Sequence, residues 1–251
     1  QLVRDVASVE RGKDEDVGRS GRFDGDGEFT RTASVGLAHK RYGALHLGRN
    51  TTSLFVSTLM FNAVGDSFGF SPAIRQYFTS GTVTGDTGWN DSIAYSSPTV
   101  GGFRANLAYA FKEGQAATDG NNWSVGLGYS QGPLALSFVA QEVKKGAATV
   151  NDTKTQQLGG AYDFGVAKVV GGYVVRETEA AGKGVYVGAV APIGAVTKVG
   201  VQHARNTETD VNATELFANY ALSKRTSLYV DYVKRNGDDR TSYALGLLHA
   251  F

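Results

Sequence analysis

The sequence contains no cysteine, only four prolines and a single methionine among its 251 residues. Without cysteine the chain has neither a disulfide framework nor a thiolate metal site. It also lacks any run of eighteen apolar residues, and its mean hydropathy is −0.21, so a transmembrane helix is excluded. These absences still allow a membrane β-barrel, because only alternate residues of a barrel strand face lipid.

An excess of charge of either sign is absent as well. The 25 lysines and arginines against 24 acidic residues give a net charge of +1, which provides no global field for nucleic acid. The histidines His39, His46, His203 and His249 are scattered without metal-ligand spacing. No glycine-rich phosphate loop follows a strand and opens a helix. The sequence therefore predicts no metal, no cofactor and no nucleic-acid partner, and it does not favour an enzyme.

The sequence does have a strict alternation of apolar and polar residues, with no sustained helical period. In the segment 103–111, Phe103 and Leu107 share one face while Arg104 and Asn106 share the other. Most such segments have about 9–12 residues, which is close to the roughly 9–11 of a tilted membrane strand and above the 5–6 of an average soluble strand. The predicted strands are 33–37, 44–48, 91–97, 103–111, 122–130, 133–143, 155–164, 166–177, 184–193, 194–204, 214–222, 226–235 and 241–251.

The connections between the predicted strands alternate between short and long, which is typical of outer-membrane barrels with short turns on one rim and long loops on the other. A soluble β-sandwich has no reason to sort its loops in this way. The short connections are 40–43, 98–102, 131–133, 165, 193–194 and 223–225. The long polar connections are 112–121, 144–154, 178–183, 205–213 and 236–240.

Aromatic residues gather near the ends of the predicted strands, and the chain itself ends on Phe251. Rings at both water–lipid boundaries form the aromatic girdles of membrane barrels. Tyrosine and phenylalanine also favour strands in general, so the signal gains weight only together with strand length and loop order. The residues concerned are Tyr42, Tyr95, Phe103, Phe111, Tyr129, Phe164, Tyr220, Tyr232, Tyr243 and Phe251.

One connection differs from the rest, because residues 50–90 show no clean alternation over such a length. An insertion of this kind inside a compact domain is usually functional or disordered. This one is too apolar for a solvated tail, so it must pack on something, and the inner wall of a barrel is the available place. Its large apolar residues are Leu54, Phe55, Leu59, Met60, Phe61, Phe68, Phe70, Tyr77 and Phe78. We therefore expect one β-barrel domain over residues 1–251, with 51–89 as an inward-folded constriction loop.

Several segments resemble general porins of Gram-negative bacteria of the betaproteobacterial type, and most of all the anion-selective porins of the comamonad group. They are GALHLGRN (43–50), NDSIAYSSPTVGGFRANLAYAF (90–111), AYDFGVAKV (161–169), LSKRTSLYVDY (222–232) and GLLHAF (246–251). The resemblance implies an outer-membrane antiparallel barrel of sixteen strands, usually a homotrimer, whose third loop folds inward. It also implies contact with outer-membrane lipid and lipopolysaccharide, and a C-terminal Phe251 that the barrel assembly machinery recognises.

The same resemblance implies a water-filled channel for passive diffusion of small hydrophilic solutes and ions, with a modest anion preference and with small anionic or neutral solutes as its partners. Thirteen predicted strands fall short of sixteen, and bacterial single-chain barrels have even strand numbers. Either the N-terminal strands are missing, or residues 1–10 form a fourteenth strand that closes a smaller barrel. The alternation of 1–10 is poor, so we expect an incomplete N-terminus, since an unclosed barrel would leave two bare edges in lipid.

If the large apolar side chains face lipid, the opposite parity of each strand faces the interior. That parity is mostly small and polar, as a wet channel requires, whereas a soluble barrel would place apolar residues inside. Phe217 and Val170 do not fit, and 184–191 is ambiguous. The predicted inner residues are Thr32, Ser34, His46, Arg104, Asn106, Ser137, Gln141, Gln157, Asp163, Lys168, Arg176, Lys198, Gln202, Glu215, Asn219 and Asp231.

Charged rings determine the ion selectivity of pores, so these charges are the candidate site. By position, Arg75 of the insertion matches an arginine in the third loop of the anion-selective porins, and Asp66 and Asp86 oppose it in the charge count. The resemblance places two further basic positions of that group at Thr32 and His46, which weakens the expected anion preference. The predicted wall partners of Arg75 are Arg104, Lys168 and Arg176, and Lys198 is a further predicted pore-lining cation.

Two other functions remain open from the sequence. A soluble β-sandwich adhesin would place its apolar residues inside and dissolve without detergent. An outer-membrane barrel enzyme would need a serine and a histidine near one rim on adjacent strands, and the sequence shows no such arrangement.

Overall fold

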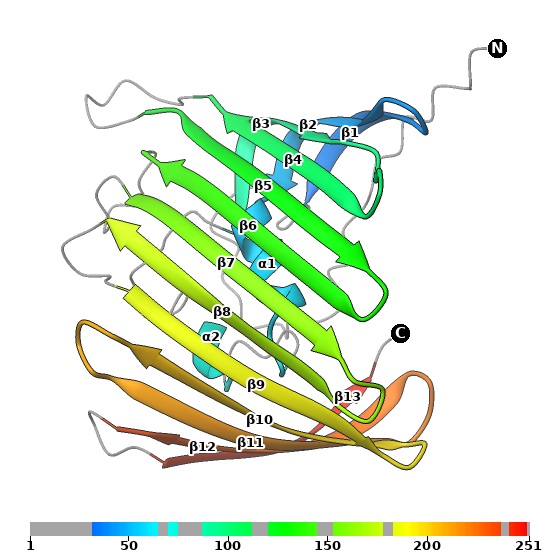
Figure 1. Ribbon diagram of the computed structural model, residues 1–251, viewed down its shortest axis with the longest axis vertical. Coiled ribbons are helices and arrows are strands. Elements are labelled where there is room, and N and C mark those ends of the chain that lie inside the picture. The colour runs from blue at the N-terminus through cyan, green and yellow to red at the C-terminus, as the bar shows by residue number, and fades with distance from the viewer. Residues whose placement is uncertain are drawn as a thin grey trace.

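The computed structural model describes residues 32–64, 70–74, 87–111, 120–144, 153–177, 183–236 and 241–249. They form one antiparallel sheet of thirteen strands in which each strand pairs with the next one in the sequence (Figure 1). The strands are β1 (Ala33–His39), β2 (Gly43–Thr51), β3 (Gly88–Ser96), β4 (Phe103–Ala110), β5 (Asn122–Gln131), β6 (Leu134–Val143), β7 (Thr153–Asp163), β8 (Lys168–Glu177), β9 (Lys183–Ile193), β10 (Thr197–Asn206), β11 (Asn212–Ala221), β12 (Thr226–Arg235) and β13 (Thr241–His249).

Each strand lies on a segment that the alternation predicts, so the prediction of an antiparallel β fold is confirmed. The strand β12 begins and ends at the predicted residues, and the ends of the other strands lie within three positions of the prediction. Two short helices in the connection between β2 and β3 are not predicted: α1 (Ser53–Met60) and α2 (Pro72–Ile74). They have eight and three residues, which is too few for a sustained 3.6-residue period.

None of the helices in the described residues is long and apolar enough to cross a membrane.

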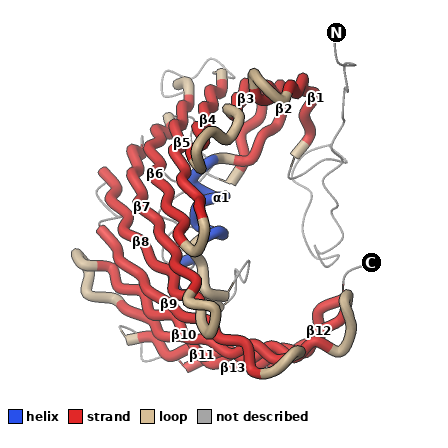
Figure 2. Tube along the Cα trace, turned by 45° about the vertical axis from the view of Figure 1, so that its right-hand side comes forward, coloured by secondary structure: helices blue, strands red, loops and turns tan. Residues whose placement is uncertain are grey.

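The sheet curls into an open wall that holds both helices on its concave side (Figure 2). Within the described residues β1 pairs with β2 alone and β13 with β12 alone, so the two edge strands do not meet. The predicted segment 1–10 lies outside the described residues, so its part in closing the barrel stays a prediction.

The two faces of the sheet differ in the way that the alternation predicts. On the convex face, large apolar side chains such as Leu37, Leu107 and Leu158 are exposed. On the concave face, which contacts the helices, polar side chains such as Gln141 and Gln202 are buried. A sheet that is apolar outside and polar inside is the arrangement of a membrane barrel, and it is the reverse of a soluble β-sandwich.

The short connections lie on one rim of the sheet, at the right of Figure 1, and the long ones lie on the other. Gly132, Gly165 and Gly194 occupy three of the short turns with positive φ angles of 57°, 80° and 67°. Only glycine adopts this left-handed conformation without strain, so these residues allow the chain to reverse within a few positions.

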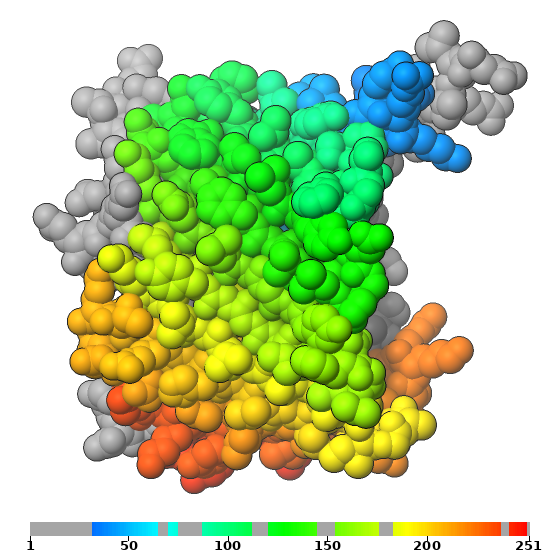
Figure 3. Space-filling model, viewed as in Figure 1, coloured from blue at the N-terminus to red at the C-terminus, as the bar shows by residue number. Residues whose placement is uncertain are grey.

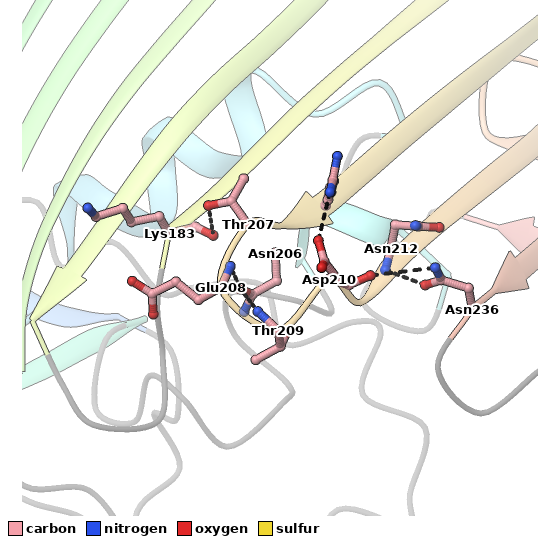
Figure 4. Close-up of polar contacts among 9 residues, drawn as sticks. Lys183, Asn206, Thr207, Glu208, Thr209, Asp210, Asn212 and Asn236 are labelled. Carbon is pink, nitrogen blue, oxygen red and sulfur yellow. Dashed lines mark hydrogen bonds and ion pairs between the residues drawn. The ribbon is translucent and has the colours of Figure 1, made fainter.

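The β10–β11 connection, on the long-loop rim, is shorter than predicted and is held by hydrogen bonds (Figure 4). Oδ1 of Asn206 accepts from the backbone N–H groups of Glu208 and Thr209 at 2.9 and 3.1 Å. Asp210 has a positive φ of 58°, and its carboxylate pairs with Arg205 at 2.6 Å. These contacts hold the connection in a compact turn rather than an extended loop.

Aromatic rings pair across neighbouring strands near both rims. The rings of Phe103 and Tyr129 lie 4.6 Å apart near the short turns, and those of Tyr232 and Tyr243 lie 5.5 Å apart near the long loops. Both distances are typical of favourable aromatic pairs. The two positions agree with the aromatic girdles of membrane barrels, whereas Phe251 lies outside the described residues.

Candidate functional site

The connection between β2 and β3 enters the concave side of the sheet through two capped helices. Oγ1 of Thr52 accepts from the N–H of Phe55 at 3.3 Å and begins α1. Oγ of Ser71 accepts from the N–H of Ile74 at 3.2 Å, and Pro72 follows at the first helical position. Helix α1 contacts β4–β7, and α2 contacts β10 and β11. The described parts of the insertion therefore lie against the inner wall over most of its width.

Polar side chains fix the insertion to the wall at three places. Oγ of Ser57 donates to Oγ of Ser137 on β6 at 3.0 Å. Nε2 of Gln157 on β7 donates to Oγ1 of Thr58 at 3.1 Å. The third contact is further along, where Oγ of Ser71 lies 3.1 Å from Oε1 of Gln202 on β10. Because all the atoms in the last two contacts are buried, breaking either contact would leave an unsatisfied polar group.

Glycines on the wall make room for the insertion. A Cβ added to Gly126 would lie 3.1 Å from Ser53, and one added to Gly188 would lie 2.7 Å from Cβ of Ala63. At Gly159 the ring of Phe61 lies directly over the backbone, so an added Cβ would clash with it.

An apolar cluster covers the wall where Phe61 is seated. It also includes Val170, Val174, Tyr186 and Ala73, all of them buried. This cluster explains why Val170 breaks the polar parity of the inner face. The inner wall is apolar around Phe61, whereas its contacts with Ser57, Thr58 and Ser71 of the insertion are polar.

Arg104 is the predicted wall cation that lies next to the insertion. A space of about 450 Å³ separates α1 from the inner faces of β3–β6, and it is lined by Arg104, Ser57, Met60 and Asn106 among others. The side chain of Arg104 is exposed, and no ion pair involves it within the described residues. Its guanidinium is therefore exposed on the inner side of the sheet, beside α1.

The other predicted wall cations do not gather around Arg104. Lys168 and Lys198 are exposed at the short-turn ends of β8 and β10. Arg176 lies eight positions beyond Lys168 on β8, a separation of roughly 26 Å at about 3.3 Å per residue. Lys168 and Arg176 therefore lie toward opposite ends of the same strand, and their joint place beside Arg75 stays a prediction.

The remaining predicted site residues are separated from this group or lie outside the described residues. His46 is half-buried on the inner face of β2, over Gly36. Oγ1 of Thr32 lies 3.1 Å from Oγ1 of Thr51 at the other end of that strand pair. Arg75, Asp66 and Asp86 lie outside the described residues, and their place at a constriction stays a prediction.

The inner-face carboxylates differ from the cations in their exposure. Glu215 on β11 is fully buried, and both of its oxygens lack a hydrogen-bond partner within the described residues. Asp231, beside it on β12, is also buried, whereas Asp163 is exposed at the short-turn rim. A count of inner-face charges from the sequence misses this difference, because burial removes two carboxylates from contact with water.

Sequence reasoning also missed the packing of the Phe61 ring over Gly159. The signal was present, because two adjacent strands each carry a Gly-Gly pair, at 159–160 and 171–172. Glycine weakens a strand and often marks a close approach of another group. The register places Gly159 opposite Gly172 and Gly160 opposite Gly171, so the four residues meet at one point of the wall.

Comparison with known proteins agrees with this architecture. A family model described as a Gram-negative porin matches residues 8–240. The chain belongs to the Gram-negative porin family. Outer membrane porin protein 32 of Delftia acidovorans is 30% identical to this porin over 270 residues, which cover 89% of this chain and 74% of that protein. An outer membrane porin of Bordetella pertussis is 26% identical, over 89% of this chain and 72% of that protein.

Solved structures show the same fold. The anion-selective porin from Comamonas acidovorans superimposes with a TM-score of 0.74 at 25% identity, over 89% of this chain and 78% of that chain. OmpF of Salmonella typhi superimposes with a TM-score of 0.71 at 12% identity, over 88% and 78%. The protein is thus a channel-forming porin of the outer membrane, as the sequence predicts.

Proposed function

We propose that this porin narrows at the insertion and passes small anions somewhat more readily than cations. The observation that carries the proposal is the different exposure of the inner-face charges. Arg104, which lines the space beside α1, is exposed, whereas Glu215 and Asp231 are buried. The anion-selective porin from Comamonas acidovorans shares the fold, and its name supports a preference for anions.

The charge nearest the narrowest point decides selectivity, rather than the total charge. At about 0.15 M salt the Debye length is roughly 8 Å, so charges at the rims are largely screened from an ion inside the channel. Charges that face a narrow, partly desolvated gap interact several-fold more strongly with the ion. Arg104 lines the space beside α1, and Arg75 of the insertion is the second candidate. We assign both to the anion preference.

The test is the reversal potential of single channels in a planar bilayer across a potassium chloride gradient. The parent is expected to prefer chloride, and Arg104→Gln should reduce that preference. The matched control is Arg225→Gln, which removes an exposed cation from the β11–β12 turn and should leave the potential unchanged. A cation-selective parent would overturn the proposal. An unchanged potential in Arg75→Ala would remove Arg75 from it.

A homotrimer is part of the proposal. A trimer form of OmpT from Vibrio cholerae shares the fold, with a TM-score of 0.61 at 15% identity over 87% of this chain and 77% of that chain. The mass of the detergent-solubilised protein, measured by multi-angle light scattering with the detergent subtracted, distinguishes three copies from one. A monomer that conducts normally would refute trimerisation and leave the channel proposal intact.

A further inference from the structure

The convex face of β4–β8 carries a groove of about 1000 Å³. This face is turned toward the viewer in Figures 1 and 3. Gly160 and Gly171 face each other across β7 and β8 and leave the outer surface without side chains at that point. Leu136 and Leu158 stand beside this gap, and the groove extends from it to Phe103. A lipid-facing surface that is otherwise covered by large apolar side chains is therefore hollowed along one line.

The groove ends at a cation. Arg41, in the β1–β2 turn, lines it at the short-turn rim. The guanidinium of Arg41 lies over the exposed ring of Tyr42, 5.8 Å from the ring centroid. Within the described residues it has no carboxylate partner. An apolar groove that ends at a free guanidinium fits a molecule with an apolar chain and an anionic head.

The whole short-turn rim is basic, which adds to the attraction for an anionic group. Asp163 is the one carboxylate that the described residues place in these turns or on the two strand residues next to them. The basic residues at the same positions are Lys40, Arg41, Arg104, Lys168, Lys198, Lys224 and Arg225.

We propose that the groove binds one acyl chain of an anionic phospholipid whose phosphate lies at Arg41. Short turns of outer-membrane barrels face the periplasm, so the lipid belongs to the inner leaflet of that membrane. Guanidinium groups bind phosphate through paired hydrogen bonds. Burial from water provides no driving force among lipids, so retention depends on the fit of the chain in the groove and on the charge at its end.

A second copy of the porin fits this groove less well. Copies in one membrane share their orientation and depth, so the basic rim of one copy would meet the basic rim of the other. Like charges placed across an interface oppose association. At that level the described residues offer only Asp163 to pair with Arg41, and phospholipid phosphate is present all along the rim.

The test is native mass spectrometry of the full-length porin in detergent with phosphatidylglycerol or phosphatidylcholine of identical acyl chains. The parent should retain phosphatidylglycerol preferentially. A basic residue near an anionic lipid surface contributes about 1 kcal/mol, which is about fivefold in affinity. Arg41→Gln should therefore lose about fivefold in phosphatidylglycerol binding, and the matched rim variant Arg225→Gln should lose little. Equal losses in the two variants would overturn the assignment of the phosphate to Arg41.

Filling the groove tests the position of the acyl chain. A Cβ at Gly160 has room, since its nearest neighbour would be Leu136 at 3.4 Å, so Gly160→Leu should place its side chain in the groove. This variant should weaken retention of both lipids, whereas Ala218→Leu, on the convex face of β11, should not. Heat-modifiable gel migration checks folding, and Arg41→Gln, in an exposed turn, tests the proposal independently. Unchanged lipid retention in Gly160→Leu, or the loss of an oligomer instead of lipid, would overturn the proposal.

Discussion

Replacing Gly159 with alanine tests whether the insertion is seated on the inner wall. An alanine Cβ would overlap one ring carbon of Phe61 and lie 2.9 Å from a second, whereas nonbonded carbons are in contact at about 3.5–4.0 Å. The ring must therefore move by about 1 Å. The wall is held by ladders of hydrogen bonds on both sides of β7, so we expect the insertion to move toward the channel axis instead.

The expected result is a smaller conductance together with a less stable barrel. Overpacking a well-packed contact typically costs about 1–3 kcal/mol, which should appear as a lower thermal transition in detergent. Single-channel recording measures the conductance of Gly159→Ala against the parent. The matched control is Gly160→Ala, one residue away on the outer face, where the nearest atom to an added Cβ lies 3.4 Å away.

This comparison distinguishes the insertion from the strand that supports it. If both Gly159→Ala and Gly160→Ala kept the conductance and the thermal transition of the parent, the packing of Phe61 over Gly159 would have no effect on the channel. That result would refute the reasoning. A similar fall in both variants would assign the effect to the strand itself rather than to the contact between Gly159 and Phe61.

Three further outcomes are expected. Phe61→Ala should increase conductance and open-channel noise, because it removes the ring that anchors the insertion, whereas Phe111→Ala at the exposed end of β4 should change neither. Glu215→Gln should raise the thermal transition at alkaline pH, where both carboxyls are ionised, since an amide relieves the repulsion from Asp231, and the gain should vanish at low pH where both carboxyls are protonated. Asn206→Ala should cost about 1 kcal/mol and speed amide hydrogen exchange in the β10–β11 turn.

The strands could be predicted from the sequence because the membrane and the channel impose opposite requirements on alternate residues. Leu107 and Arg104 on β4 show both requirements within four residues. A shift of one residue would place an entire strand the wrong way round, so the pattern also fixes the register. The same reasoning located the exposed Arg104, because a cation on a wet wall needs no partner.

The packing of the insertion could not be predicted in the same way. Helix α1 has only eight residues, and it buries polar Ser57 and Thr58 against the wall while Val56 and Met60 are exposed, so no amphipathic period marks it. Glu215 has the parity of a channel-lining residue, yet it is fully buried on the inner face of β11, which α2 contacts. Both results depend on contacts between segments far apart in the sequence, and alternation within one strand carries no information about those contacts.

The four glycines of β7 and β8 place two functions on the same part of the wall. Gly159 and Gly172 face inward, where the rings of Phe61 and Tyr186 lie directly over them. Gly160 faces outward with its partner on β8 and forms the floor of the lipid groove. Because none of the four has a side chain, the wall here is a single layer of backbone between the insertion and the lipid. A substitution on the inner face therefore acts on conductance and one on the outer face acts on lipid binding, although the two residues are neighbours in the sequence.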